Sequence, residues 1–141
     1  MSNMKKVLSF GTFDFLHSGH IFTFEKARKL GDTLIVSVAR DRAIKKIKGK
    51  NPLHTEDERL ALVRHIDMVD EAFLGDEELG VYSFFKKFVP DIIALGYDQP
   101  ELKKDVEAFI ATNEYHTICI TLPPYKNGKT KSSTIKKSLG L

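Results

Sequence analysis

Short apolar runs of strand length alternate along the chain with stretches whose apolar residues recur at helical spacing. Each short run is apolar nearly throughout, which is typical of strands that are covered on both faces. The predicted strands are Val7–Phe10, Thr33–Val38, Val69–Leu74, Asp91–Leu95 and His116–Leu122.

Helical stretches separate these runs. In His20–Leu30, apolar side chains recur every three residues and predict one buried helix face. The segment Thr55–Glu58 is a capping box, in which Thr55 begins a helix and Glu58 bonds back to it. Further helices are predicted at Leu79–Phe88, Leu102–Ala111 and Ser133–Leu139.

This alternation predicts right-handed crossovers and a parallel sheet between two layers of helices. We therefore expect an α/β fold with a five-stranded parallel sheet and helices on both faces, in a single domain over residues 1–141. In open parallel sheets, ligands bind beyond the carboxyl ends of the strands. The loops at that edge are the first place to look for chemistry.

Composition narrows the class of protein. With 141 residues, of which 42% are hydrophobic and 29% charged, the chain suits one soluble globular domain. A net charge of +3 is too small to indicate a nucleic-acid partner, and we expect none. The single cysteine, Cys119, excludes an intrachain disulfide and a Cys-rich metal site, and we expect it in the core. Neither a membrane span nor a signal peptide is recognisable, so we expect a cytoplasmic protein with no membrane partner.

The segment Gly11–His20, after the first predicted strand, carries the clearest chemistry. Gly11 allows a sharp turn, and His17 and His20 lie three residues apart with Gly19 between them. If a helix begins near Ser18, both imidazoles flank its first turn, where unpaired N–H groups favour phosphate. A histidine pair without a third ligand is a weak zinc pattern, and a plain polar cap explains the spacing equally well.

The segment Gly11–His20 resembles the HxGH signature of the cytidylyltransferase-like nucleotidyltransferase family, and the resemblance extends over essentially the whole chain. The later matching pieces are Leu30–Val36, Lys48-Gly49, Glu58-Arg59, Val69-Asp70, Pro90–Ile92 and Ser132–Thr134. Members of this family transfer a nucleoside monophosphate from a nucleoside triphosphate to a phosphorylated acceptor and release pyrophosphate. Their fold is a Rossmann-like α/β domain, which agrees with the hydrophobic pattern.

The resemblance implies roles for individual residues. His17 and His20 would hold the α- and β-phosphates and stabilise the transition state, and Lys48 would contact phosphates. Gly11, Thr12 and Phe13 would present backbone amides to the nucleotide, and Gly19 would leave room for phosphate oxygens. Asp14 would lie where the acceptor and the phosphates meet. The ribose and base would be bound at Gly96, Asp98 and Gln99, and the triphosphate at Ser132, Ser133 and Thr134.

Several of these positions have a purely structural alternative. Lys48 lies in a lysine run that could be a solvated helix end, and Asp98 could cap the next helix. The Ser132–Thr134 segment could be an ordinary N-cap, and Arg59 could belong to a surface ion pair. The phenylalanines between residues 82 and 88 are expected to face the core.

The resemblance also implies cofactors and partners. A phosphate oxygen is nucleophilic at neutral pH, so the reaction requires alignment and charge neutralisation rather than a strong base. Mg²⁺ bridging the phosphates would need little protein ligation, so we predict no protein metal ligands. ATP is expected as the substrate that supplies the nucleotide, and a homodimer is expected because relatives are commonly dimeric.

Two segments favour the branch of archaeal FAD synthases, which move AMP from ATP onto FMN: Val38–Asp41 and Leu95–Gln99. Cytidylyltransferases typically show a tryptophan after the residue matching Asp98, whereas this chain has none. Glycerol-3-phosphate enzymes carry an arginine where Asp67 stands here. The alternatives are a glycerol-3-phosphate cytidylyltransferase, a heptose-phosphate adenylyltransferase and a nucleotide-binding protein without catalytic activity.

Overall fold

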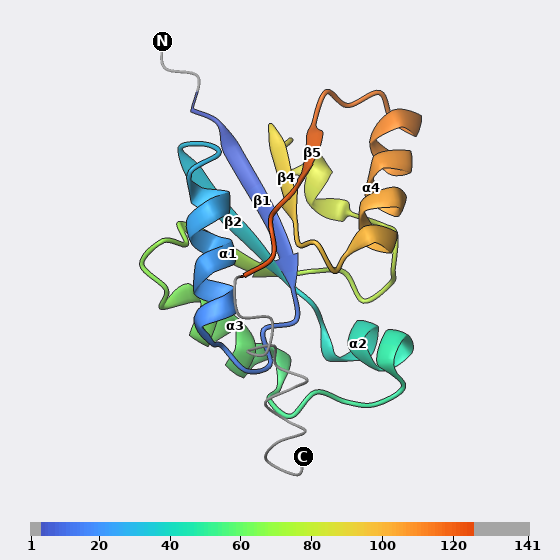
Figure 1. Ribbon diagram of the computed structural model, residues 1–141. Coiled ribbons are helices and arrows are strands. Elements are labelled where there is room, and N and C mark those ends of the chain that lie inside the picture. The colour runs from blue at the N-terminus through green and yellow to red at the C-terminus, as the bar shows by residue number, and fades with distance from the viewer. Residues whose placement is uncertain (1–3, 126–141) are drawn as a thin grey trace.

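The computed structural model describes residues 4–125 (Figure 1). Five parallel strands form one sheet in the order β3-β2-β1-β4-β5. The five predicted strands are confirmed, with small changes at their ends. They are β1 (Lys6–Gly11), β2 (Thr33–Val38), β3 (Glu71–Leu74), β4 (Ile92–Leu95) and β5 (Ile118–Thr121).

The α-helices within the described residues are α1 (Ser18–Arg28), α2 (Asp41–Lys48), α3 (Glu56–Arg64) and α4 (Pro100–Thr112). The capping box at the start of α3 is confirmed: the Thr55 side chain accepts a hydrogen bond from the Glu58 N–H, and the Glu58 carboxylate accepts one from the Thr55 N–H. The predicted helix at Ser133–Leu139 lies outside the described residues.

The prediction of a full helix at Leu79–Phe88 was wrong. Only a short 3-10 helix, η1 (Ser83–Lys86), forms there. Tyr82 adopts a left-handed backbone conformation with a φ of 46°, and the Asp76 carboxylate accepts hydrogen bonds from the Ser83 N–H and hydroxyl. An α-helix cannot pass through a left-handed residue, so the chain forms one tight turn that buries the aromatic rings.

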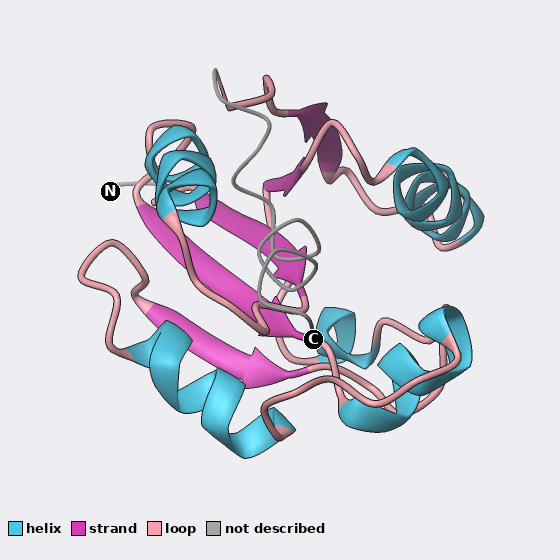
Figure 2. Ribbon diagram, turned by 60° about the horizontal axis from the view of Figure 1, so that its bottom comes forward, coloured by secondary structure: helices cyan, strands magenta, loops and turns pink. Residues whose placement is uncertain are grey.

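Helices cover both faces of the sheet, as predicted (Figure 2). Val7 of β1 packs on the face covered by α1 and α3, and the adjacent Leu8 packs on the face covered by η1 and α4. This alternation is the two-residue period of a strand. Phe84 and Phe85 are buried on the same face as Leu8. Cys119 lies half-buried at the margin of that hydrophobic cluster rather than fully in the core.

The topology fixes the place of the site. β1 is central, and the chain proceeds outward from it to β2 and β3 before crossing over to β4 and β5. The order therefore reverses between β1 and β4, and ligands of doubly wound sheets bind at the carboxyl ends of such strands. Helix α2 lies beyond this same edge (Figure 1). Between residues 4 and 125, no helix is long and apolar enough to cross a membrane.

Candidate active site

The two histidines form the N-terminal cap of α1. His17 is the N-cap residue, with extended backbone, and its Nδ1 accepts a hydrogen bond from the Gly19 N–H at 3.0 Å. Nδ1 of His20 accepts in turn from the His17 N–H at 3.3 Å. The ring centres are 4.1 Å apart and the rings are tilted by 30°. The sequence left a polar helix cap and a histidine pair as alternatives. The two histidines in fact form the cap and lie side by side as a pair.

These contacts fix the protons of both rings. A neutral imidazole whose Nδ1 accepts a hydrogen bond carries its proton on Nε2. Burial lowers the pKa of His17, and burial together with the neighbouring His17 lowers the pKa of His20 to about 4. Both rings are thus neutral at pH 7 and each presents an Nε2–H donor. Nε2 of His17 is buried and has no hydrogen-bond partner among the described residues, so it is a donor suited to an anionic oxygen.

The turn between β1 and α1 packs against the histidine pair. Phe13 has a φ of 55° and is buried, with its ring 5.4 Å from that of His20 and 5.3 Å from that of Phe24. A Cβ on Gly11 would lie only 2.3 Å from the Phe13 ring, so glycine is required there. The side chain of Phe13 therefore positions His20, and only its backbone is available for the nucleotide contact that the resemblance implies.

Asp14 anchors a distant loop. Its carboxylate is buried and accepts hydrogen bonds from the N–H groups of Leu53 and His54 at 2.9 and 2.8 Å. Those residues lie in the loop between α2 and α3, so Asp14 ties that loop to the turn that carries the histidines. The predicted role at the meeting point of acceptor and phosphates stays a prediction, and the structure adds this second role.

Arg59 is the functional residue that sequence reasoning missed. The alternative of a surface ion pair was wrong, because the side chain is fully buried. Its Nη1 donates to the carbonyls of Thr12 and Ala39 at 2.9 and 2.6 Å, its Nε to the His54 carbonyl at 3.1 Å, and its Nη2 to Asp41 at 2.6 Å. One guanidinium thus joins the loops after β1, β2 and α2. Its position in the buried stripe of α3, next to Leu60 and Val63, was the signal in the sequence.

On the other side of the switch point, Gln99 connects two strand ends. Its side-chain oxygen accepts from the Gly96 N–H at 2.8 Å, and its amide donates to the Phe10 carbonyl at 3.3 Å. A Cβ on Gly96 would come within 2.7 Å of the Asp98 carboxylate. Asp98 itself is exposed, and Gln99 rather than Asp98 is the N-cap of α4. The three residues predicted to bind the ribose and base lie in this one turn, and the Gln99 side chain already bonds to the backbone of Gly96 and Phe10.

A shallow groove of about 280 Å³ opens beside this turn. It lies between the end of β4, the first turns of α4 and the end of β5, and its lining residues are Gly96, Tyr97, Gln99, Pro100, Lys103, Lys104, Glu107 and Thr121. Lys103 crosses it and donates to the Thr121 hydroxyl at 2.9 Å. The groove offers polar and cationic groups at the same edge of the sheet as the histidines.

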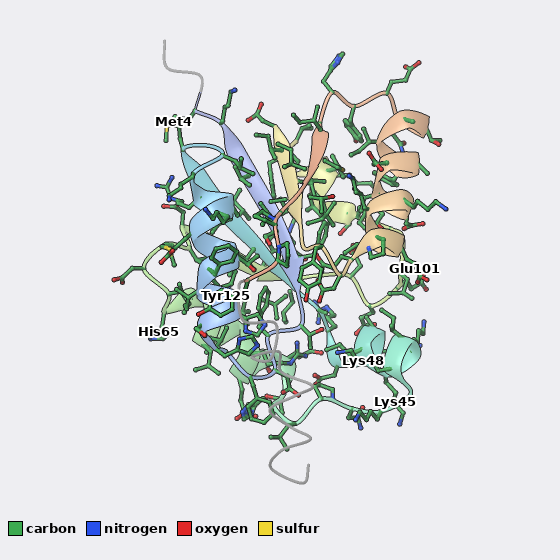
Figure 3. All side chains as sticks on the ribbon, viewed as in Figure 1. Met4, Lys45, Lys48, His65, Glu101 and Tyr125 are labelled. Carbon is green, nitrogen blue, oxygen red and sulfur yellow. The ribbon has the colours of Figure 1, made fainter. Side chains whose placement is uncertain are left out.

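The remaining predicted residues are placed only in part. Lys48 is the last residue of α2 and is exposed, and Figure 3 shows it with Lys45 beyond the carboxyl edge of the sheet. The predicted triphosphate segment Ser132–Thr134 lies outside the described residues. Within residues 4–125, no group of three or more His, Cys, Asp or Glu side chains stands close enough to hold a metal ion.

A doubly wound sheet with two neutral imidazoles on the first turn of a helix at its switch point is the arrangement of a Rossmann-like domain that binds nucleotide phosphates. The family model described as "Cytidylyltransferase-like" matches residues 8–138. The chain therefore belongs to the cytidylyltransferase-like family, as its sequence resemblance predicted.

Individual relatives narrow the comparison. A curated FAD synthase of Thermoplasma acidophilum is 35% identical over 136 residues, covering 96% of this chain and 94% of its own. The FAD synthase of Ferroglobus placidus is 50% identical over 96 residues, which are 68% of this chain but only 61% of that protein. A crystal structure of a lipopolysaccharide core biosynthesis protein from Thermoplasma volcanium superposes with a TM-score of 0.79 at 36% identity, covering 88% of this chain and all of the other.

Proposed function

We propose that the protein is an FAD synthase, which transfers AMP from ATP to FMN and releases pyrophosphate. FAD synthases at 35% to 50% identity support this assignment, and one of them is matched along nearly its whole length. The single observation that carries the chemistry is the pair of Nε2–H donors at the start of α1. They stand at the switch point of the sheet, one of them buried and without a partner among the described residues.

The reaction needs no covalent enzyme intermediate. A phosphate oxygen of FMN attacks the α-phosphorus of ATP and forms the new P–O bond. The bond between the α-phosphorus and the α,β-bridging oxygen breaks, and that oxygen leaves with the pyrophosphate. Charge builds up on the phosphoryl oxygens during this step, and we propose that the Nε2–H groups of His17 and His20 and the helix N-terminus stabilise it.

We propose that Mg²⁺ is bound through the phosphates of the substrate. The buried carboxylate beside the histidines, Asp14, already accepts two backbone N–H groups, and the described residues offer no cage of ligands. Mg²⁺ commonly keeps several waters and binds substrate phosphates, which suits this donor set. When bound, the ion would neutralise phosphate charge, while the histidines and backbone amides hold the oxygens in line.

Other parts of the assignment rest on the resemblance. We propose that Lys48 and the Ser132–Thr134 segment contact the triphosphate, and that Gly96 and Asp98 lie at the ribose and base. A homodimer and a cytoplasmic location are further proposals of the same kind.

The assay that tests the function pairs each donor with each acceptor. The protein is incubated with ATP or CTP, Mg²⁺, and FMN, glycerol 3-phosphate or a heptose 1-phosphate, and both the adduct and pyrophosphate are measured. We expect FAD and pyrophosphate from ATP and FMN. Transfer of CMP with FMN ignored would contradict the proposal, and ATP binding without pyrophosphate release would favour a protein that has lost catalysis.

The histidines provide the mechanistic test. Replacing His17 or His20 by alanine removes one preorganised donor, and we expect turnover to fall about 10²- to 10³-fold while the far-ultraviolet circular dichroism is unchanged. His65→Ala, at the exposed end of α3, is the matched control and should keep full turnover. Near-normal turnover in the His17 and His20 variants would remove these rings from the chemistry.

A further inference from the structure

An aromatic corner stands beside the histidine pair. The ring of Phe15 packs edge to face against the imidazole of His54, with 5.3 Å between ring centres. Leu53, next to His54, is 54% exposed. The two sides of this corner come from loops 39 residues apart in the sequence, the turn after β1 and the loop between α2 and α3. The corner is defined here as Phe15, Leu53 and His54.

Hydrogen bonds to two buried charged side chains hold the backbone of this corner. The His54 N–H donates to the buried carboxylate of Asp14, and the His54 carbonyl accepts from the buried guanidinium of Arg59. Leu53 is fixed by the other oxygen of Asp14. Two buried charged groups therefore position half-exposed apolar side chains, which is how binding loops are preorganised on a rigid scaffold.

The corner is close to the reacting phosphates. Phe15 precedes His17 by two residues, so their Cα atoms are separated by at most about 7 Å. In FMN the ring system is joined to the phosphate by a flexible ribityl chain, so the ring must lie within a short reach of the histidines while the phosphate reacts. The nucleotide is expected on the opposite side of the switch point, at Gly96 and Asp98.

We propose that Phe15, Leu53 and His54 form the docking surface for the flat isoalloxazine ring of the acceptor, an inference that rests on the proposed FAD synthase function. Flat aromatic ligands gain most from apolar and aromatic surfaces that are already in place. The corner offers one aromatic ring, one imidazole and one aliphatic side chain, whereas the groove beside α4 is lined by Lys103, Lys104 and Glu107. The apolar corner suits the ring, and the charged groove does not.

The test separates acceptor binding from donor binding. Phe15→Leu keeps the apolar volume but removes the ring, and His54→Ala removes the imidazole without touching the backbone contacts. FMN binding is measured by quenching of its fluorescence, and the KM values for FMN and ATP are measured separately. We expect the Kd and KM for FMN to rise about tenfold in each variant, with the KM for ATP and the thermal midpoint unchanged. His65→Ala is the matched control for His54→Ala.

The possible failures are distinguishable. If the wild-type protein neither bound FMN nor made FAD, the proposed function would fail and the docking surface with it. If the wild type made FAD while both variants bound FMN as tightly as His65→Ala, the docking surface would be wrong and the proposed function would stand. Equal weakening of FMN and ATP would also overturn the inference, because it would show that the corner only supports the fold.

Discussion

At both edges of the sheet, charged side chains form hydrogen bonds with the backbone, but they are exposed at the amino edge and buried at the carboxyl edge. At the amino edge, Asp32, Asp70 and Asp91 each accept one backbone N–H, at 2.8 Å, near the start of β1 or β2. These aspartates are exposed. At the carboxyl edge, the buried carboxylate of Asp14 accepts two backbone N–H groups, and the buried guanidinium of Arg59 donates to three carbonyls.

The comparison shows what the buried charges do. Each exposed carboxylate at the amino edge accepts one backbone N–H from a segment 27 to 85 residues away, and water can readily replace that hydrogen bond. A buried charge is costly unless every partner is in place, so it fixes the loops that supply those partners. The amino edge is therefore built for stability alone. The carboxyl edge gives up some stability in order to hold three loops in one arrangement around the histidines.

Arg59→Met removes the side chain that joins three loops at the carboxyl edge, so we expect it to have the largest effect. Methionine fills much of the space but leaves three carbonyls without their donor and Asp41 without its buried partner. We expect the free energy of unfolding to fall by about 3 to 5 kcal/mol, measured by urea denaturation, and FAD synthesis to be lost.

Arg64→Met is the control on the same helix. Arg64 also donates to a carbonyl, that of Ala72, but it is exposed. We expect a loss of about 1 kcal/mol or less, with turnover unchanged. Equal losses in the two variants would contradict the view that burial makes Arg59 special.

Arg59 also shows where the sequence stops being informative. The strands, the Thr55 capping box and the position of the histidines could be predicted, because each depends on periodicity or on contacts within a few residues. The partners of Arg59 come from three loops, two of them 20 and 47 residues away in the sequence. The sequence therefore offered only a surface ion pair as the structural alternative for Arg59, since no local pattern indicates distant partners.

The same reasoning explains the wrong helix at residues 79–88. Its apolar spacing was correct, and Phe84 and Phe85 are buried as predicted. The backbone departs from helix at Tyr82, which adopts a left-handed conformation and whose hydroxyl bonds to Asp105 of α4. Periodicity predicts which side chains are buried, but it predicts neither a left-handed residue nor a contact with a distant segment.

The second prediction concerns how stability depends on pH through the buried His20 at the carboxyl edge. The pKa of His20 falls from 6.5 in an unfolded chain to about 4 in the folded one. The unfolded state therefore binds more protons between these values, so stability is fully present above pH 6.5 and is lost as the pH falls toward 4. We expect the wild type to lose about 3 kcal/mol more than His20→Asn between pH 7 and pH 4, measured by urea denaturation at each pH. Parallel curves for wild type and His20→Asn would show that burial of His20 does not govern the acid response.

The last prediction compares a matched pair of aspartates, one on each edge. Asp14→Asn keeps one oxygen as acceptor but turns an amide NH₂ toward a backbone N–H, and we expect a loss of about 1 to 3 kcal/mol in stability. The loop carrying Leu53 and His54 would loosen, so kcat/KM for FMN should fall more than that for ATP.

Asp91→Asn makes the same chemical change at an exposed position with one hydrogen bond. There we expect about 0.5 kcal/mol and unchanged kinetics, because the remaining amide oxygen can accept the single N–H, the NH₂ group faces water, and no loop of the site depends on the contact. If Asp91→Asn impaired FAD synthesis as much as Asp14→Asn, the two edges would not differ in function, and the division between a stabilising edge and a site-forming edge would have to be abandoned.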